Sequence, residues 1–159
     1  MILRIGFGVD VHRLAPGIPL YIGGIQIPSD IGAVGHSDAD VLLHAICDAI
    51  LGAANLRDIG YHFSDKDPQY KGIDSKILLT NVVDLMKTHG YSLINLDSTV
   101  ILEQPKLNPH IPHIQSIIAA ILKVDIGVVS IKATTHERVD SFGEGLAIKA
   151  YATVLLQKH

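Results

Sequence analysis

The chain has very little cysteine and no excess of positive charge. Cys47 is the single cysteine, so an intrachain disulfide is excluded, and its thiol is expected to be a small buried group within a helix. The 13 basic residues against 16 acidic ones give a net charge of -3, without the basic surplus typical of nucleic-acid-binding proteins. No apolar run approaches the roughly 18 residues of a membrane-spanning helix. We therefore expect neither nucleic acid nor membrane as a partner.

Length and composition indicate one folded domain. The 159 residues are 48% apolar and 18% charged, which is normal for a globular chain with a core of its own. The first strand is expected to begin almost at the N-terminus, with no signal or transit peptide before it. We expect a single domain over residues 1–159 and a cytoplasmic location, although an organelle protein without its leader would have the same pattern.

The pattern of apolar residues predicts a mixture of strands and helices without internal repeats. Strands are expected over residues 2–14, 91–103, 127–135 and 145–156, a short hairpin over 19–28, and helices over 38–53, 74–89 and 109–123. Ser37 is the expected N-cap of the first helix and Asp74 that of the second. The last strand is apolar on most of both faces, so both should be covered. With three helices available, the second cover is expected from another copy of the chain.

The most informative residues are Asp10, His12 and His44. Asp10 and His12 lie two apart in a predicted strand, so their side chains point to the same face, and His44 lies in the first predicted helix. A carboxylate and two imidazoles suit zinc, and three protein ligands leave the fourth tetrahedral position open for catalysis. From these residues alone, an ordinary polar or core role for each histidine remains the alternative.

Two further features allow more than one interpretation. Asp40, His44 and Asp48 recur every four residues on one face of the helix, either as a solvated face or as acids that orient a ligand histidine. Residues 57–73 are predicted to form a long loop rich in aspartate, glycine and aromatic residues. Such a loop is either functional or a solvated connection.

Separate blocks along nearly the whole chain resemble the family of 2-C-methyl-D-erythritol 2,4-cyclodiphosphate synthases, enzymes of the non-mevalonate route to isoprenoids. The blocks that carry the resemblance include Gly8–Leu14, Gly23-Gly24, His36–Val41, Asp58–Gly60, Pro105-Lys106, Lys132–Thr135 and Gly143–Gly145. The resemblance implies an α+β fold: a four-stranded sheet with three helices on one face plus a short hairpin. It also implies that three such sheets pack around a three-fold axis in a homotrimer, with active sites between neighbouring subunits.

The resemblance further implies a reaction. In this family the 2-phosphate of 4-diphosphocytidyl-2-C-methyl-D-erythritol 2-phosphate attacks the β-phosphorus of the same molecule, which gives a cyclic diphosphate and releases CMP. The enzyme is thus a phosphorus-oxygen lyase. Because the nucleophile belongs to the substrate, the protein has to fold the substrate back on itself and bring two anionic phosphates together.

Metal roles follow at the matching positions. The resemblance implies zinc at Asp10, His12 and His44, and a second divalent cation, Mg²⁺ or Mn²⁺, at Glu137. Asp40 and Asp48 would support these ligands or flank them. The residues implied in catalysis or in binding the cytidine diphosphate substrate are His36, Ser37, Asp58, Gly60, Phe63, Asp65, Lys106, Ala133, Thr134 and Thr135, of which His36, Asp58 and Thr135 are the catalytic ones.

The chain departs from the family pattern in two places. The stretch after Glu137 is shorter, with Phe142 where a basic residue is common, and Phe7 and Val9 replace other residues usual there. In the family these positions line a cavity on the three-fold axis that can hold an isoprenoid diphosphate. We expect a more apolar cavity here, without its cations, and weak or no diphosphate binding.

Two other functions are alternatives to the cyclase. A zinc-dependent phosphoester or amide hydrolase would use water as nucleophile with a general base beside the metal. A non-catalytic zinc protein would need a fourth protein ligand, often cysteine, and Cys47 lies off the face of the helix that carries His44.

Overall fold

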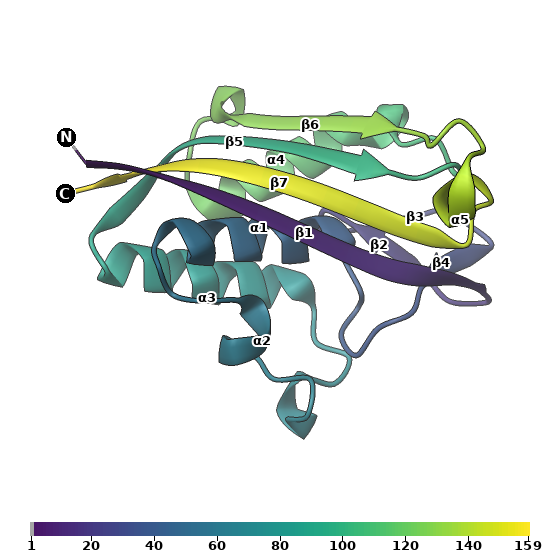
Figure 1. Cartoon of the computed structure of the whole chain (residues 1–159), viewed down its shortest axis with the longest axis horizontal. Coiled ribbons are helices and arrows are strands. Elements are labelled where there is room, and N and C mark those ends of the chain that lie inside the picture. Colours follow the sequence, from purple (N-terminus) through teal and green to yellow (C-terminus); the bar gives the residue numbers. More distant parts are fainter. Residues whose placement is uncertain (1) are drawn as a thin grey trace.

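The computed structural model describes residues 2–159, which form a sheet covered on one side by helices (Figure 1). Within these residues the main sheet has five strands in the order β4-β1-β7-β5-β6, and β2 pairs with β3 in a separate hairpin. Neighbouring strands run antiparallel except β5 and β6, which are parallel. The strands are β1 (Ile2–Pro16), β2 (Leu20–Ile22), β3 (Ile25–Ile27), β4 (Ile31–Ala33), β5 (Tyr91–Ile101), β6 (Val129–Thr134) and β7 (Ala147–Lys158).

The helical layer consists mainly of α1 (Val41–Ala53), α3 (Ser75–Thr88) and α4 (Ile111–Leu122), which pack against one another and the sheet (Figure 1). Helix α1 is apolar on most of its circumference and lies directly on β1 and β7, so it forms the centre of the core. Shorter elements are α2 (Ile59–His62), α5 (Asp140–Gly143) and 3-10 turns at Pro68–Tyr70, Asn108–His110 and Ile126–Val128. Among residues 2–159, no helix has both the length and the apolar character needed to cross a membrane.

Two glycines let α1 approach β1 closely. A Cβ atom placed on Gly6 would lie 1.8 Å from the carbonyl oxygen of Ala49, and one on Gly8 would lie 2.0 Å from that of Ala45. Both distances are far below van der Waals contact, so these positions of β1 accept only glycine while the helix stays where it is. The backbones of the strand and the helix are therefore in direct contact beside the site described below.

Asp40 joins the start of α1 to the hairpin. Its buried carboxylate accepts hydrogen bonds from the amides of Gly23 (2.9 Å), Gly24 (2.7 Å) and Leu43 (3.1 Å). Burial raises the pKa of Asp40, and the three amide bonds oppose that shift. The prediction of Ser37 as N-cap is wrong, because the helix begins three residues later and Asp40 caps it.

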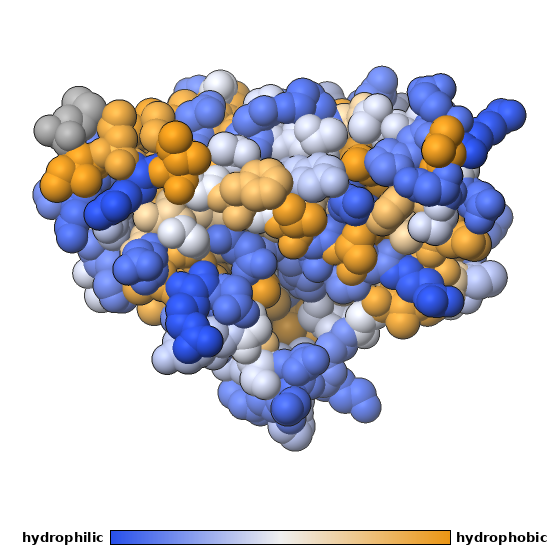
Figure 2. Space-filling model, viewed as in Figure 1, coloured by the Kyte–Doolittle hydropathy of each residue, from blue (hydrophilic) through white to orange (hydrophobic). Residues whose placement is uncertain are grey.

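The face of the sheet opposite the helices is largely apolar and open in the single chain. Ile5 is 74% exposed and Phe7 62%, and the Phe7 ring stacks on Tyr151 of β7 with ring centroids 6.0 Å apart. Figure 2 shows apolar side chains gathered at the end of the molecule where β1 begins. The inner face of β7 is covered by α1, so the expected second cover of this strand is not supplied by the described residues of the same chain.

Most predicted elements are confirmed, with two corrections besides the start of α1. The main sheet has five strands among the described residues instead of four, because Ile31–Ala33 pairs with the end of β1 as β4. Residues 57–73 are not wholly a loop, since they contain α2 and a 3-10 turn. The hairpin and the Asp74 cap of α3 are as predicted.

Candidate metal and substrate site

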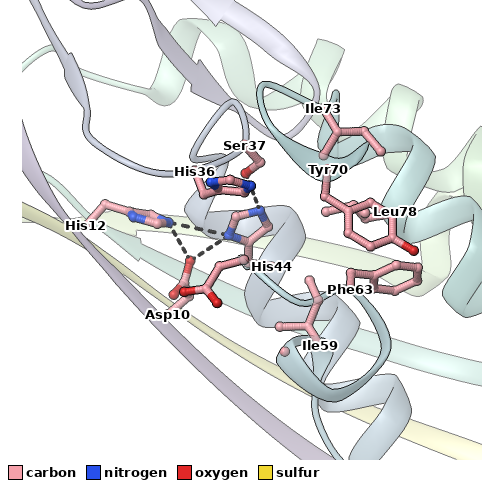
Figure 3. Close-up of a pocket in the computed structure, with 12 residues that line it drawn as sticks. Asp10, His12, His36, Ser37, His44, Ile59, Phe63, Tyr70, Ile73 and Leu78 are labelled. Atoms are coloured by element: carbon pink, nitrogen blue, oxygen red, sulfur yellow. Dashed lines mark hydrogen bonds and ion pairs between the residues drawn. The ribbon is translucent and has the colours of Figure 1, made fainter. Parts of the chain in front are cut away.

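Asp10, His12 and His44 converge on one point between β1 and α1 (Figure 3). Asp10 Oδ2 lies 2.9 Å from His12 Nε2 and 3.0 Å from His44 Nδ1, and the two nitrogens are 3.4 Å apart. In the part of the chain that the structure describes, no other group of three such side chains places its donor atoms this close together. Strand β1 contributes Asp10 and His12, whose side chains point to the same face, and helix α1, which packs on β1, contributes His44.

The ligand His12 is oriented by the backbone. Its Nδ1 donates a hydrogen bond to the carbonyl oxygen of Val34, 3.0 Å away. A carbonyl oxygen can only accept, so Nδ1 carries a proton and Nε2, which lies beside Asp10, is the nitrogen left to bind a metal ion. On His44, Nε2 lies 2.9 Å from Ser75 Oγ and 3.2 Å from Ser37 Oγ.

The charges of the three side chains are mutually dependent. Burial would raise the pKa of Asp10, but hydrogen bonds with His12 and His44 outweigh it and lower the pKa to about 2. Burial would lower the pKa of His44, but its hydrogen bond with Asp10 outweighs that and raises the pKa above 6.5. The Asp10 carboxylate is thus anionic at neutral pH and attracts whatever cation shares the site, a proton on imidazole or a metal ion.

The donor set fits a divalent metal ion. Two imidazole nitrogens and one carboxylate oxygen within 4.8 Å of one another match three corners of a tetrahedral site. The fourth corner would face the adjoining cavity, which all three ligands help to line.

That cavity has a volume of about 390 Å³ and two unlike sides. His36 and Ser37 lie near the metal ligands, whereas Phe63 and Tyr70 stand across from them with ring centroids 5.5 Å apart (Figure 3). Other lining residues are Ile59, Gly60, Asp65, Ile73 and Leu78. The cavity therefore offers polar groups beside the metal position and an apolar surface opposite.

The two predicted acids of α1 hold backbone segments. Asp40 contacts backbone amides of the hairpin and helix start, and among the described contacts its carboxylate bonds neither imidazole. Asp48 accepts a 2.7 Å hydrogen bond from the amide of Ile59, and burial followed by the nearby charge of Asp58 raises its pKa. Asp58 itself is exposed at the start of α2 and is not part of the cavity lining.

A second group of predicted residues lies elsewhere, where β5 and β6 end (Figure 1). Lys106, Ala133, Thr134 and Thr135 line a cavity of about 180 Å³. Lys106, Thr135 and Glu137 line an adjacent one of about 910 Å³. Neither cavity shares a lining residue with the metal cavity, so one described protomer does not bring the two groups together.

The turn that carries Glu137 has an unusual backbone. Glu137, Arg138 and Asp140 have φ values of 52°, 60° and 63°, a left-handed conformation that costs energy for residues with a side chain. The carboxylate of Glu103 accepts hydrogen bonds from the amides on both sides of Glu137, those of His136 (2.8 Å) and Arg138 (3.4 Å). Glu103 therefore holds Glu137 in place from the end of β5.

A cation lies beside the Phe142 ring within the single chain. Lys149 Nζ lies 4.1 Å from the centroid of the Phe142 ring and 5.7 Å from that of Tyr151. The resemblance to the family does not predict this cation–π contact, because Lys149 belongs to a different element, strand β7.

Sequence reasoning missed three polar residues that hold the site. Ser75 and Asp38 support His44, and Glu103 supports Glu137. No spacing in the chain links Ser75 to His44, since their contact depends on how α3 packs against α1. In the sequence, Asp38 is distinguished only by its place in the block His36–Val41 that resembles the family.

Known proteins of similar sequence and fold are cyclodiphosphate synthases. A 2-C-methyl-D-erythritol 2,4-cyclodiphosphate synthase of Porphyromonas gingivalis is 58% identical over 96% of this chain and 94% of its own length. A CDP-bound structure of a 2C-methyl-D-erythritol-2,4-cyclodiphosphate synthase has a TM-score of 0.90 at 36% identity, over 97% of this chain and 100% of that one.

A longer protein carries the same fold. The bifunctional IspDF of Campylobacter jejuni has a TM-score of 0.95 at 37% identity over 99% of this chain, which spans 43% of that protein. Residues 3–157 also match the model of the YgbB family. With a family match over nearly its whole length and closely similar synthases, the chain belongs to the YgbB family.

Proposed function

We propose that this chain converts 4-diphosphocytidyl-2-C-methyl-D-erythritol 2-phosphate to 2-C-methyl-D-erythritol 2,4-cyclodiphosphate and CMP, as a phosphorus-oxygen lyase of isoprenoid precursor biosynthesis. The observation that carries the proposal is the convergence of Asp10, His12 and His44 at the wall of a cavity, in a chain 58% identical to a synthase of that name.

The residues of the cavity suit a reaction in which the substrate supplies its own nucleophile. His36 and Ser37 would hold the phosphates and the erythritol unit beside the ligands, with Gly60, Phe63 and Asp65 on the loop side. Zinc bound by Asp10, His12 and His44 would polarise the β-phosphate. The apolar wall at Phe63 and Tyr70 would exclude water, which keeps hydrolysis from competing with ring closure.

The second group of residues would act from a neighbouring copy. Glu137 would hold Mg²⁺ or Mn²⁺, Thr134 and Thr135 would contact the diphosphate, and Lys106 with Ala133 would enclose the cytidine. Support comes from their separation from the metal cavity within one protomer and from the exposed apolar face around Phe7. A homotrimer that buries this face would bring the two groups together between subunits.

The test is CMP release from this substrate with Mg²⁺, with phosphorus NMR of the second product. CMP together with a cyclic diphosphate and no inorganic phosphate supports the cyclase. CMP with a linear product would mean that water attacks, which is the hydrolase alternative. A metal-loaded trimer that does not turn over would contradict both.

The isoprenoid-diphosphate prediction for the three-fold cavity can be tested separately. We expect farnesyl diphosphate to give little or no thermal stabilisation, because Phe7, Val9 and Phe142 make this surface apolar. Lys149 is the cation that works against this expectation. A concentration-dependent stabilisation that disappears in Lys149→Met would contradict it and assign the diphosphate to that lysine.

A further inference from the structure

Hydrogen bonds lead from His44 away from the metal position to a carboxylate. His44 Nε2 lies 2.9 Å from Ser75 Oγ, and the Ser75 hydroxyl donates to Asp38 Oδ1. A carboxylate only accepts, so the hydroxyl proton points to Asp38. Ser75 Oγ is then an acceptor toward His44, which places an imidazole proton on Nε2 and makes Nδ1, 3.0 Å from Asp10 Oδ2, the nitrogen that can give up its proton to bind a metal ion.

Asp38, the last acceptor in this series of hydrogen bonds, is held by backbone amides. Asp38 Oδ2 accepts from the amide of Ser75 at 2.9 Å, and Oδ1 accepts from the amide of Asp40 at 3.1 Å. Ser75 is the first residue of α3 and is fully buried, so Asp38 lies at the positive end of that helix. Both carboxylate oxygens of Asp38 are thus fixed by backbone donors, which keeps Oδ1 in place as the acceptor of the serine hydroxyl.

We propose that Ser75, supported by Asp38, is a positioning residue that holds His44 in the tautomer whose Nδ1 binds the metal ion. The inference rests on the proposed metal site but not on the reaction. It distinguishes the two histidines, because a backbone carbonyl fixes His12 whereas a replaceable side chain fixes His44. Loss of the Ser75 hydroxyl removes the acceptor of the Nε2 proton, so a neutral His44 keeps its remaining proton on Nδ1, where it occupies the position of the metal.

The test variant is Ser75→Ala, which removes the hydroxyl and leaves the backbone amide that binds Asp38. The Asp74 cap of α3 is also unchanged, so the helix start stays intact. Zinc affinity is measured by competition with a chromophoric chelator, and the expected loss is about 10- to 100-fold. The His44 tautomer is read from long-range ¹H–¹⁵N correlations of the metal-free protein at a pH where the imidazole is neutral.

Two serine variants serve as controls. Ser98 is 2% exposed and donates to the carbonyl oxygen of Ser130 in the sheet, so Ser98→Ala makes the same change at a buried serine that is not bonded to a ligand. We expect no change in zinc affinity or tautomer there. Ser37→Ala removes the other hydroxyl near His44 Nε2, at 3.2 Å, and is expected to shift the tautomer less than Ser75→Ala.

Each outcome decides the proposal. An Nε2–H tautomer in the wild-type protein that becomes mixed in Ser75→Ala, with weaker zinc binding, supports it. An Nδ1–H tautomer in the metal-free wild type overturns it even if the variant does not fold. Unchanged affinity in a folded Ser75→Ala variant, or a larger effect of Ser37→Ala, also overturns it. If the tautomer result holds but no CMP is released, the proposed function fails and this inference stands.

Discussion

The metal cavity and the turn that carries Glu137 are built in opposite ways. Asp10, His12 and His44 lie in a strand and a helix, and both imidazoles have a hydrogen-bond partner behind them. Glu137 lies on an exposed turn with a left-handed backbone, held mainly by Glu103. One protomer therefore fixes the candidate metal ligands from both sides, whereas Glu137 depends on one acid and, in our proposal, acts together with a second copy.

The largest effect is expected at the metal ligands. His44→Ala should abolish metal binding and reduce CMP release about a thousandfold or more, because a Lewis-acid metal supplies several kcal/mol. The measurement is CMP formation together with metal content. His89→Ala is the matched control, since this exposed histidine ends α3 far along the chain from the ligands. Substantial turnover by metal-free His44→Ala would contradict the metal role.

Mixing two inactive variants tests whether the two regions act across subunits. His44→Ala damages only the metal cavity and Glu137→Ala only the turn. In randomly reassembled trimers, about a quarter of the interfaces would combine an intact cavity with an intact turn, so activity should return to about that fraction. The measurement is CMP release before and after joint unfolding and refolding. No recovery from well-folded mixed trimers would place both halves of the site in one protomer.

A smaller effect is expected from Glu103→Ala. Two amides next to Glu137 would lose their acceptor while the turn keeps its strained φ values, at a cost of about 1–3 kcal/mol. We expect weaker Mn²⁺ binding, read by electron paramagnetic resonance, with zinc affinity unchanged. Glu103→Gln keeps an acceptor oxygen and should restore much of the loss. Equal losses of both metals would indicate general misfolding instead.

The smallest effect concerns pH in the metal-free protein. Burial lowers the pKa of His44 but the bond to Asp10 raises it above 6.5, so folding favours the protonated imidazole. This contribution to stability is present below pH 6.5 and is lost as the pH rises through the raised pKa. Thermal unfolding with a chelator should therefore show stability falling with rising pH in this range, and less so in His44→Ala. Parallel curves for the two proteins would contradict the coupling.

Local patterns were sufficient to predict most of the elements and to select Asp10, His12 and His44, whose side chains converge in the structure. Alternation in β1 identified Asp10 and His12 as neighbours, and helical spacing placed His44 on α1. Local patterns also misplaced the helix start, since Ser37 and Asp40 are both good caps by type. Asp40 is the actual cap, because its buried carboxylate also accepts hydrogen bonds from the amides of Gly23 and Gly24. Local sequence patterns do not predict this tertiary contact.

The remaining site residues required tertiary structure or resemblance. Thr134, Thr135 and Glu137 look like a polar strand end in the sequence and were identified only through the family. Ser75 meets His44 only because α3 packs beside α1, and Glu103 meets the turn only because β5 ends beside β6. Such contacts between distant segments have no signature in a single sequence.

Because Gly6 and Gly8 have no side chain, α1 can lie close to β1, and this separation determines the distances within the proposed metal site. Gly8, Asp10 and His12 alternate on one face of β1, so the same row that carries two ligands also leaves room for α1. A methyl group on Gly8 would meet the carbonyl oxygen of Ala45, next to His44, and would displace the helix by about an ångström, several times the ~0.2 Å that metal–ligand distances tolerate. The geometry of the proposed metal site thus depends on a position that touches no metal, and a search for altered metal specificity should include residue 8.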